Sequence, residues 1–457
     1  MTQRAPRNRH TDNQDGDNRE GGNRAAGKRG STIPFVQAAA RIKPALAQGH
    51  PWIYREAVDR APKGLASGTW VHVQCGNLQA YGLWDAEGPI AVRLFASRRP
   101  PNRAWVAACV EQAWQRRAPL RGSLGNPSGD LSGDFSQDPA QTISAYRWLY
   151  GESDGLPGVV VDLYGHVDGH VDGQIGQVQP AEVVYWAVVR IYSPSVALLL
   201  PWVVDALVDV AARAGIVLAG VVERGADAPV LHVGDMPPTP LMLLEYGVRF
   251  EADLIQGQKT GFFLDQRENR RMIGQWSRGR RVLNLFAYTG GFSVFAALGG
   301  ATHVTSVDSA APAMAAAARN FTHNGLDPAA HEFVTADCFE LLEKYHGEGR
   351  RFDLIVVDPP SFARARAQLD KALHAYTRLN ALAMKCLEPG GILASSSCTS
   401  QVGPEAFRLM LAEAAAEAKR RALILHEAGH APDHPVLAGF AEARYLKFVL
   451  ATVEPLG

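Results

Sequence analysis

The sequence predicts an α/β protein whose C-terminal part is built around a parallel, doubly wound β-sheet. Two observations predict this sheet. From about residue 256 to the end, short apolar runs typical of buried strands alternate with helical stretches. Residues 281–308 also read as a strand, a glycine turn, an apolar helix and a second strand that ends in an acid. Upstream, Gly and Pro turns separate short β-like runs, which predicts a smaller β-rich domain.

Length and composition bound the class of protein. A chain of 457 residues with 47% hydrophobic and 20% charged residues has room for two or three soluble domains. Its five cysteines are odd in number and show no C-x-x-C spacing, which argues against disulfides and zinc and fits a reducing, cytoplasmic setting. The first thirty residues hold no apolar segment, and the most apolar run, 196–204, is too short to cross a bilayer. We therefore expect neither a secretion signal nor a membrane span.

Charge gives only local hints of a nucleic-acid surface. Lys plus Arg equals Asp plus Glu, so the net charge gives no support to nucleic-acid binding. Arginines cluster in three groups; the second is interpreted as a solvated helix face, and the first and third are the better binding candidates. The groups are Arg98, Arg99 and Arg103; Arg116, Arg117 and Arg121; and Arg267, Arg270, Arg271, Arg278, Arg280 and Arg281.

Composition divides the chain into five segments. Residues 1–30 are polar and basic and have almost no apolar side chains, so we expect a disordered tail. Residues 31–100 should form the β-rich domain, and 101–142 a helix followed by a flexible linker. A central α/β domain is expected at 143–254, and the C-terminal domain at 255–457.

The expected elements follow the apolar patterns in order. Before residue 255 we expect strands at 70–73, 91–94, 159–164, 182–192 and 242–254, and helices at 104–117 and 195–213. After residue 255 we expect strands at 282–286, 303–308, 332–335, 352–357 and 391–395, helices at 292–298, 312–324 and 369–386, and a terminal hairpin of 421–425 with 445–453.

A Gly-His-Val-Asp sequence occurs twice in succession after residue 164. His166, Asp168, His170 and Asp172 have the residue types of a metal clip. A duplicated turn in a surface loop is the preferred interpretation, so we expect no metal.

The glycine turn at residues 288–291 predicts a site for a nucleotide-type cofactor. A strand that passes through glycines into a helix brings backbone N–H groups to a ligand, and Asp308, at the end of the next strand, suits a ribose diol. The G-x-G-x-x-G triplet that seats a dinucleotide is missing, whereas Gly290 and Gly291 are enough for S-adenosylmethionine, which has no phosphate. We expect S-adenosylmethionine; an NAD enzyme and a βαβ unit without a ligand are the alternatives.

The other candidate residues lie at strand ends of the same sheet. Ligands of open α/β sheets bind at the carboxyl ends of the strands, so side chains found there should share one edge. The residues expected at this edge are Phe286, Tyr288, Thr289, Gly290, Gly291, Asp308, Asp337, Asp358, Pro359 and Cys398.

Two of these residues have the chemistry of a reaction centre. Prolines after Asp358 remove backbone donors and fix the turn, so that the carboxylate can accept from an exocyclic amine; a cap of the next turn is the structural alternative. Cys398 lies at a strand end, whereas the other four cysteines are interpreted as buried core residues. A thiolate that adds to carbon 6 of cytosine makes carbon 5 nucleophilic, which requires a cysteine beside a methyl donor.

Several motifs together resemble the bacterial 23S ribosomal RNA 5-methylcytosine methyltransferases. In the C-terminal part they are QGQKTGFFLDQR (256–267), LNLFAYTGG (283–291), DPPSF (358–362), SC (397–398), DHPV (433–436) and YLK (445–447). Upstream, GHPWIY (49–54) is similar to the start of that family's PUA domain, and ESDGLPG (152–158) to its central domain. The resemblance covers most of residues 33–457 in matching order.

The resemblance implies an architecture and partners. It implies an N-terminal PUA domain that holds RNA, a central α/β domain, and a C-terminal Rossmann-like class I methyltransferase domain with a seven-stranded, mostly parallel sheet. It also implies S-adenosylmethionine as the cofactor and 23S ribosomal RNA as the partner. A homodimer is an option that the sequence leaves open.

The resemblance also implies a role for each candidate residue. Asp308 would hold the ribose of the cofactor and Asp337 its adenine. Asp358, with Pro359 beside it, would contact the target base, and Cys398 would be the covalent nucleophile. The methionine part of the cofactor would be lined by Tyr288, Thr289, Gly290 and Gly291. Phe286, Asp358 and Pro359 are also expected to contact the cofactor. The base that removes the proton from carbon 5 is not identified.

Two other functions stay open. The domain that methylates nitrogen 7 of guanine in the same RNA has similar motifs but no cysteine after the corresponding strand, and under this hypothesis Cys398 is idle. The non-enzymatic alternative is an RNA-binding assembly factor with a vestigial cofactor pocket. The intact Gly290, Gly291, Asp308 and Asp358 argue against it.

Overall fold

A computed structural model describes residues 33–96, 99–121, 142–167, 183–225, 228–363 and 368–456. Several sequence predictions lie outside these residues. They concern the tail at 1–30, the linker that follows residue 121, Arg98, and residues 168–172 of the Gly-His-Val-Asp repeat.

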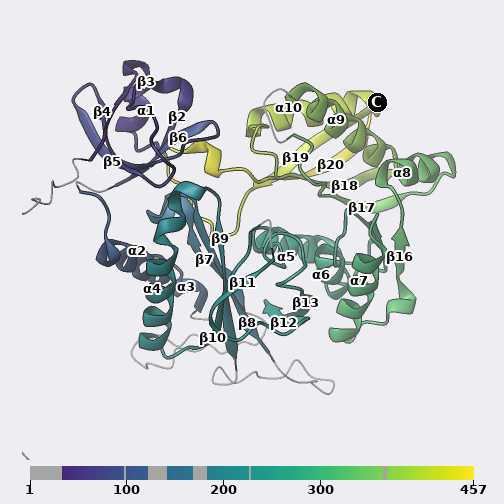
Figure 1. Cartoon of the computed structure of the whole chain (residues 1–457). Helices are drawn as coiled ribbons and strands as arrows, with labels where there is room; N and C mark the ends of the chain where they lie inside the picture. Colours follow the sequence, from purple (N-terminus) through teal and green to yellow (C-terminus); the bar gives the residue numbers. More distant parts are fainter. Residues whose placement is uncertain are drawn as a thin grey trace, which may run out of the picture. The chain divides into compact units, whose positions relative to one another are not determined.

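The N-terminal part folds as the predicted β-rich unit. Its sheet has the order β2-β6-β5-β4-β1-β3 and carries the short helix α1 (Lys43–Ala47) beside it (Figure 1). The strands are β1 (Phe35–Ala38), β2 (Trp52–Tyr54), β3 (Val58–Arg60), β4 (Trp70–Cys75), β5 (Leu78–Trp84) and β6 (Ile90–Phe95). In β4, buried and half-buried residues alternate, as expected of a strand that turns one face to a core.

The central part is a second sheet covered by helices. Its order is β11-β10-β9-β8-β7, and β9 and β10 run parallel. The strands are β7 (Ala145–Tyr150), β8 (Val159–His166), β9 (Val184–Ile191), β10 (Val217–Glu223) and β11 (Val230–Gly234); the helices are α2 (Arg103–Arg116), α3 (Ala118–Arg121) and α4 (Leu200–Arg213). The apolar faces of α2 and α4 share one core with β7, β8 and β9. Strands β10 and β11 were not predicted.

One helical stretch in this part is apolar enough to cross a membrane. Among the described residues, Pro194–Arg213 alone passes a test of length and composition, with a mean hydropathy of 1.8. More than half of it, 56%, is buried inside the protein, where it contributes to the shared core of α2 and α4. This burial is that of a helix packed in the protein core.

The single strand predicted at 242–254 is instead a hairpin. Strands β12 (Leu241–Glu245) and β13 (Val248–Ala252) pair antiparallel. Tyr246 and Gly247 join them with φ angles of 52° and 76°. Two adjacent residues with positive φ form the tight turn that reverses the chain, and the apolar residues on both sides had hidden it.

The C-terminal part confirms the predicted doubly wound sheet. Between residues 281 and 455 the structure describes a seven-stranded sheet in the order β16-β15-β14-β17-β18-β20-β19, parallel except for β20, which runs antiparallel to both neighbours. Its strands are β14 (Arg281–Leu285), β15 (His303–Asp308), β16 (Glu332–Thr335), β17 (Phe352–Val357), β18 (Leu387–Ser397), β19 (Arg420–Ala428) and β20 (Lys447–Pro455).

Helices cover both faces of this sheet (Figure 1). One core contains apolar residues of α8, α9 and α10, and a second core contains residues of α5, α6 and α7 together with the β12–β13 hairpin. The helices are α5 (Arg267–Trp276), α6 (Gly291–Leu298), α7 (Ala311–His323), α8 (Cys338–Gly347), α9 (Leu369–Lys385) and α10 (Pro404–Glu417). The sequence had not predicted α5, α8 or α10.

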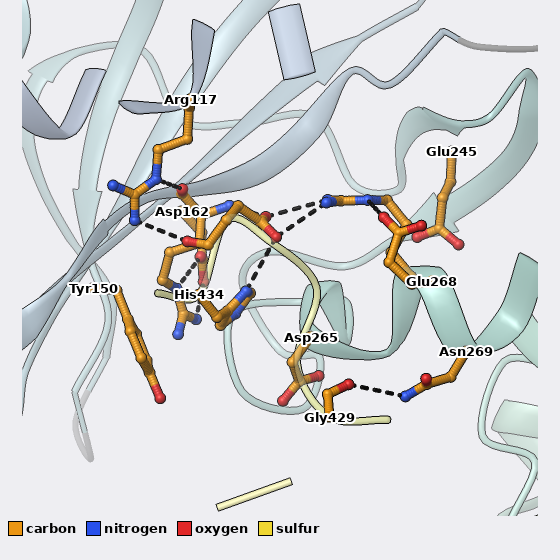
Figure 2. A network of polar contacts seen from close by, with 12 residues as sticks. Arg117, Tyr150, Asp162, Glu245, Asp265, Glu268, Asn269, Gly429 and His434 are labelled. Atoms are coloured by element: carbon orange, nitrogen blue, oxygen red, sulfur yellow. Dashed lines mark hydrogen bonds and ion pairs between the residues drawn. The ribbon is translucent and has the colours of Figure 1, made fainter. Parts of the chain in front are cut away.

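Two of the predicted arginine surfaces are in part buried ion pairs. In the third group, Arg267 is fully buried and makes a bidentate pair with Asp433, at 3.0 and 3.1 Å, and Arg270 is paired with Glu245. Figure 2 shows the surrounding network of polar contacts, with Arg117, Glu268 and His434 labelled. In the second group, Arg117 is 2% exposed and is not part of a solvated face. Arginine takes these positions because its planar guanidinium matches a carboxylate with two hydrogen bonds.

The Arg267–Asp433 pair also joins distant parts of the chain. The backbone N–H of Arg147, in β7, donates to the second carboxylate oxygen of Asp433 at 2.8 Å, and Arg117 donates to the Asp433 carbonyl at 2.8 Å. Arg117 in turn makes a bidentate pair with Asp154. Removing one partner of such a buried pair typically costs about 3–5 kcal/mol, because the other charge is left without compensation.

Candidate active site

The register of the sheet brings the predicted strand-end residues to one edge. Leu285 lies beside Val307 and Val357 in the neighbouring strands, and Val357 lies beside Ser395. The residues that follow these positions therefore emerge together at the carboxyl edge. They are Phe286 after β14, Asp308 at the end of β15, Asp358 after β17 and Cys398 after β18.

The loop between β14 and α6 has an unusual backbone. Phe286, Tyr288 and Gly290 have φ angles of 56°, 47° and 78°. For residues other than glycine this region costs about 1 kcal/mol or more, and it is concentrated at ligand sites. Neighbouring elements hold the shape: the N–H of Tyr288 donates to Asp308 at 2.9 Å, and the amide of Asn320 donates to the Thr289 carbonyl at 2.8 Å.

The two glycines of this loop leave no room for a side chain. A Cβ at Gly290 would lie 2.9 Å from the Cβ of Ala317, and one at Gly291 would lie 2.8 Å from Cδ of Arg270. The backbone therefore passes close to α7 and α5, and α6 begins at once. This shape fits a cofactor that is bound through backbone groups and a helix N-terminus.

Asp308 and Asp337 both support backbone at the sheet edge. Asp308 accepts from the N–H groups of Tyr288 and Ala310 with its two carboxylate oxygens. Asp337 caps α8 by accepting from Phe339 at 2.8 Å and Glu340 at 3.1 Å through one oxygen. Because each carboxylate oxygen has two lone pairs, both residues keep acceptor capacity for a ligand.

Asp358 is tied to its surroundings through a glutamine. The side-chain amide of Gln266 donates to Asp358 at 3.0 Å and to the hydroxyl of Ser396 at 2.9 Å. Burial raises the pKa of Asp358 to about 6. At neutral pH the group is therefore mostly a carboxylate and can accept a hydrogen bond from a base.

Cys398 differs from the other four cysteines. Cys75, Cys109, Cys338 and Cys386 are buried, and Cys398 is partly accessible. Burial raises the pKa of the Cys398 thiol, and the carboxylates of Asp358 and Asp265 raise it further. The ammonium groups of Lys259 and, to a smaller extent, Lys447 lower this pKa.

The sequence motifs contain polar residues to which no role was given. The ammonium of Lys259 pairs with Asp265 at 2.8 Å, and the hydroxyl of Tyr445 donates to the same oxygen at 2.5 Å. Burial alone would raise the pKa of Asp265, but Lys259, His434 and Tyr445 hold it well below its usual value. The other oxygen of Asp265 is buried without a partner among the described residues. The position of these residues inside 256–267 and 445–447 was the only sequence signal.

A metal site is not found in the part of the chain that the structure describes. No group of three His, Cys, Asp or Glu residues there is arranged to hold an ion. His166, the described member of the repeat, instead accepts a hydrogen bond from the backbone N–H of Met242 at 3.0 Å. The rest of the repeat lies outside the described residues.

Comparison with known proteins shows the family to which the chain belongs. Residues 217–449 match the family described as S-adenosylmethionine-dependent methyltransferase, and residues 39–97 match the PUA-like domain. This chain is an S-adenosylmethionine-dependent methyltransferase. The predicted fold class and cofactor are thereby confirmed, whereas the predicted domain boundaries and the roles of single residues stay predictions.

Similar proteins match this methyltransferase over nearly its whole length. The "Ribosomal RNA large subunit methyltransferase" of Deinococcus radiodurans is 39% identical over 427 residues, which cover 90% of this chain and 95% of the relative. The "Ribosomal RNA large subunit methyltransferase I" of Klebsiella pneumoniae subsp. pneumoniae is 34% identical and covers 91% and 98%. A solved methyltransferase complexed with S-adenosylhomocysteine shares the fold, with a TM-score of 0.75 at 21% identity, and covers 92% and 99%.

Replacing Gly290 by alanine should weaken the binding of S-adenosylmethionine by about tenfold. The new Cβ would meet Ala317 at a positive φ, and a strain of about 1–2 kcal/mol must be relieved by moving the loop. Isothermal titration calorimetry of the free enzyme measures the Kd.

The matched control is Gly325→Ala. Gly325 also has a positive φ, 68°, but has open space around it and lies outside the loop. This variant should lose stability without losing affinity. An unchanged Kd in Gly290→Ala would show that the loop does not hold the cofactor.

Proposed function

We propose that the chain methylates carbon 5 of a cytosine in large-subunit, 23S ribosomal RNA through a covalent bond to Cys398. The observation that carries this proposal is that two reactive groups lie at the ends of two paired strands. They are the partly accessible Cys398, after β18, and the half-buried Asp358, after β17. The relatives named as ribosomal RNA large subunit methyltransferases support the choice of RNA.

The chemistry of cytosine explains why a cysteine is needed. Carbon 5 is too weak a nucleophile to take a methyl group directly. When the Cys398 sulfur bonds to carbon 6, electron density moves to carbon 5, which can then attack. S-adenosylmethionine supplies the methyl group. Loss of the proton from carbon 5 then expels the thiolate and restores the aromatic ring.

Other residues of the edge would orient the two reactants. Asp358, mostly ionised at neutral pH, would accept from the exocyclic amine of the cytosine, and Pro359 would hold the turn. Asp308 would bind the ribose of the cofactor, and Asp337 its adenine. The loop residues Tyr288, Thr289, Gly290 and Gly291 would enclose its methionine part, and Phe286 and Pro359 would also contact the cofactor.

The N-terminal sheet would hold the RNA outside the reaction centre. Residues 39–97 match a PUA-like domain, and the family resemblance assigns RNA binding to such a domain. Because the ribosome is assembled in the bacterial cytoplasm, we propose a cytoplasmic enzyme.

Replacing Cys398 by alanine should abolish methyl transfer, by on the order of a thousandfold or more, because the route through carbon 6 is lost. The substrates are 23S transcript and large ribosomal subunits from a strain that lacks the enzyme. Labelled S-adenosylmethionine and nucleoside mass spectrometry measure the amount and identity of the product, which should be 5-methylcytidine. The variant should still bind the cofactor.

Cys75→Ala is the control, since Cys75 is buried in the N-terminal sheet and should not affect the rate. Full transfer by Cys398→Ala would favour methylation of a ring nitrogen. If the unaltered protein transfers no methyl group to either substrate, the assembly-factor hypothesis takes its place.

We propose in addition that β19 pairs with β19 of a second copy. It is the outer strand of the sheet, and Leu423, Ile424 and Leu425 are 40–46% exposed. An outer strand offers unpaired backbone groups to another strand. Antiparallel pairing centred on Ile424 would place Arg421 opposite Glu427 of the other copy. Within the chain these two residues pair with Glu454 and Arg408, so the charges would join existing ion pairs.

Sedimentation velocity tests this association. The unaltered protein should form a dimer at micromolar concentration, and Ile424→Lys should dissociate at least about tenfold more readily, because two like charges would meet at the centre of the pairing. Leu298→Lys, at the end of α6, is the control for an exposed leucine elsewhere. A monomer at all concentrations would refute the homodimer.

A further inference from the structure

Lys447 is a buried lysine next to the reactive cysteine. It begins β20 and is only 4% exposed. In the pairing of β20 with β18 it lies opposite Ser397, the residue before Cys398. Its ammonium donates to the carbonyl of Thr399, the residue after Cys398, at 2.6 Å. The side chain of Lys447 therefore reaches from beside Ser397 to the carbonyl of Thr399, past the backbone of Cys398.

The partners of Lys447 leave its charge without compensation. The second hydrogen bond goes to the carbonyl of Tyr445 at 2.8 Å, so both acceptors are neutral and one of the three N–H donors remains. No ion pair of Lys447 with a carboxylate is found among the described residues. A buried cation in this situation is stabilised by an anion nearby. Burial lowers the pKa of Lys447 to about 8, and the field of Cys398 raises it.

Lys447 is one of two cations that face Cys398 among the described residues. The other, Lys259, opposes the rise in the thiol pKa more strongly than Lys447 does, but its ammonium is already paired with Asp265 at 2.8 Å. The groups coupled to Cys398 are Lys259, Asp265, Asp358, Tyr376 and Lys447. The negative charges of Asp265 and Asp358 destabilise a thiolate. The phenol of Tyr376 is uncharged and is hydrogen-bonded to the hydroxyls of Ser397 and Thr399.

We propose that Lys447 is a positioning residue whose charge favours the thiolate form of Cys398. The inference rests on the proposed covalent function of Cys398. At neutral pH the amine, with a pKa of about 8, is mostly an ammonium, and it stabilises the thiolate by charge alone. The S–H bond breaks by proton transfer to water, so no other reactant is needed.

The same charge serves the reaction twice. With the ammonium of Lys447 nearby, the thiolate that attacks carbon 6 forms more readily. When the product forms, the sulfur leaves as a thiolate again, and the ammonium stabilises it as a leaving group. Lys447 thus acts through the sulfur and need not touch the base.

The test measures the titration of Cys398 without RNA or cofactor. The full-length protein is treated briefly with iodoacetamide between pH 6 and pH 10, and mass spectrometry follows the peptide that contains Cys398. Because the other four cysteines are buried, they should react more slowly. Lys447→Met, which has a similar length and no charge, should raise the midpoint by about one unit and slow alkylation at neutral pH about tenfold.

Three variants control for charge, position and structure. Lys447→Arg keeps the charge and should restore most of the rate. Lys385→Met, at the end of α9, removes a lysine elsewhere and should change nothing. Lys447→Gln keeps a donor for Thr399 and replaces the methionine variant if melting curves show that the latter is unfolded.

A midpoint that stays at the unaltered value in Lys447→Met or Lys447→Gln would overturn the proposal. So would equal shifts in the methionine and arginine variants, because the charge would then not be the cause. Failure here can be told from failure of the proposed function. In the latter case Cys398→Ala would still methylate RNA, whatever the titration of the thiol shows.

Discussion

The buried pair of Arg267 with Asp433 is the interaction on which the candidate site depends. It fixes the start of α5 to the segment that follows β19, and the backbone of Arg147 adds the central sheet to the same carboxylate. Next to the pair, the N–H of Ala431 donates to the Asp265 carbonyl at 3.0 Å. The pair therefore determines where the residues just before Arg267 can lie, as the network in Figure 2 makes visible.

Three consecutive residues at this point serve three parts of the site. Asp265 holds Lys259 and Tyr445, Gln266 holds Asp358 and Ser396, and Arg267 holds Asp433. Such a short segment can orient all three because it forms the 3-10 turn Leu264–Gln266 that leads directly into α5. The reaction centre thus combines a sheet edge, which brings strand ends together, with a rigid turn that fixes their polar side chains.

Much of this arrangement follows from the sequence, and the exceptions have physical reasons. An apolar run of the right length predicted β17 at its observed bounds, since a strand buried on both faces leaves a continuous signal. The half-buried outer strand β16 was also predicted at its observed bounds. Arg267 was interpreted as part of a surface because its carboxylate partner, Asp433, is 166 residues away in the chain. A local pattern cannot show such a partner. The turn at Tyr246 escaped prediction because apolar residues flank it on both sides.

The central claim is a covalent bond between Cys398 and the target base, and a mechanism-based trap tests it most directly. In 23S transcript containing 5-fluorocytidine, fluorine replaces the proton at carbon 5, so the cysteine adduct cannot be resolved after methyl transfer. We predict a protein–RNA complex that survives denaturing electrophoresis, carries one methyl group and maps to the peptide of Cys398. Absence of this complex, under conditions in which ordinary RNA is methylated by the same enzyme, would contradict the account.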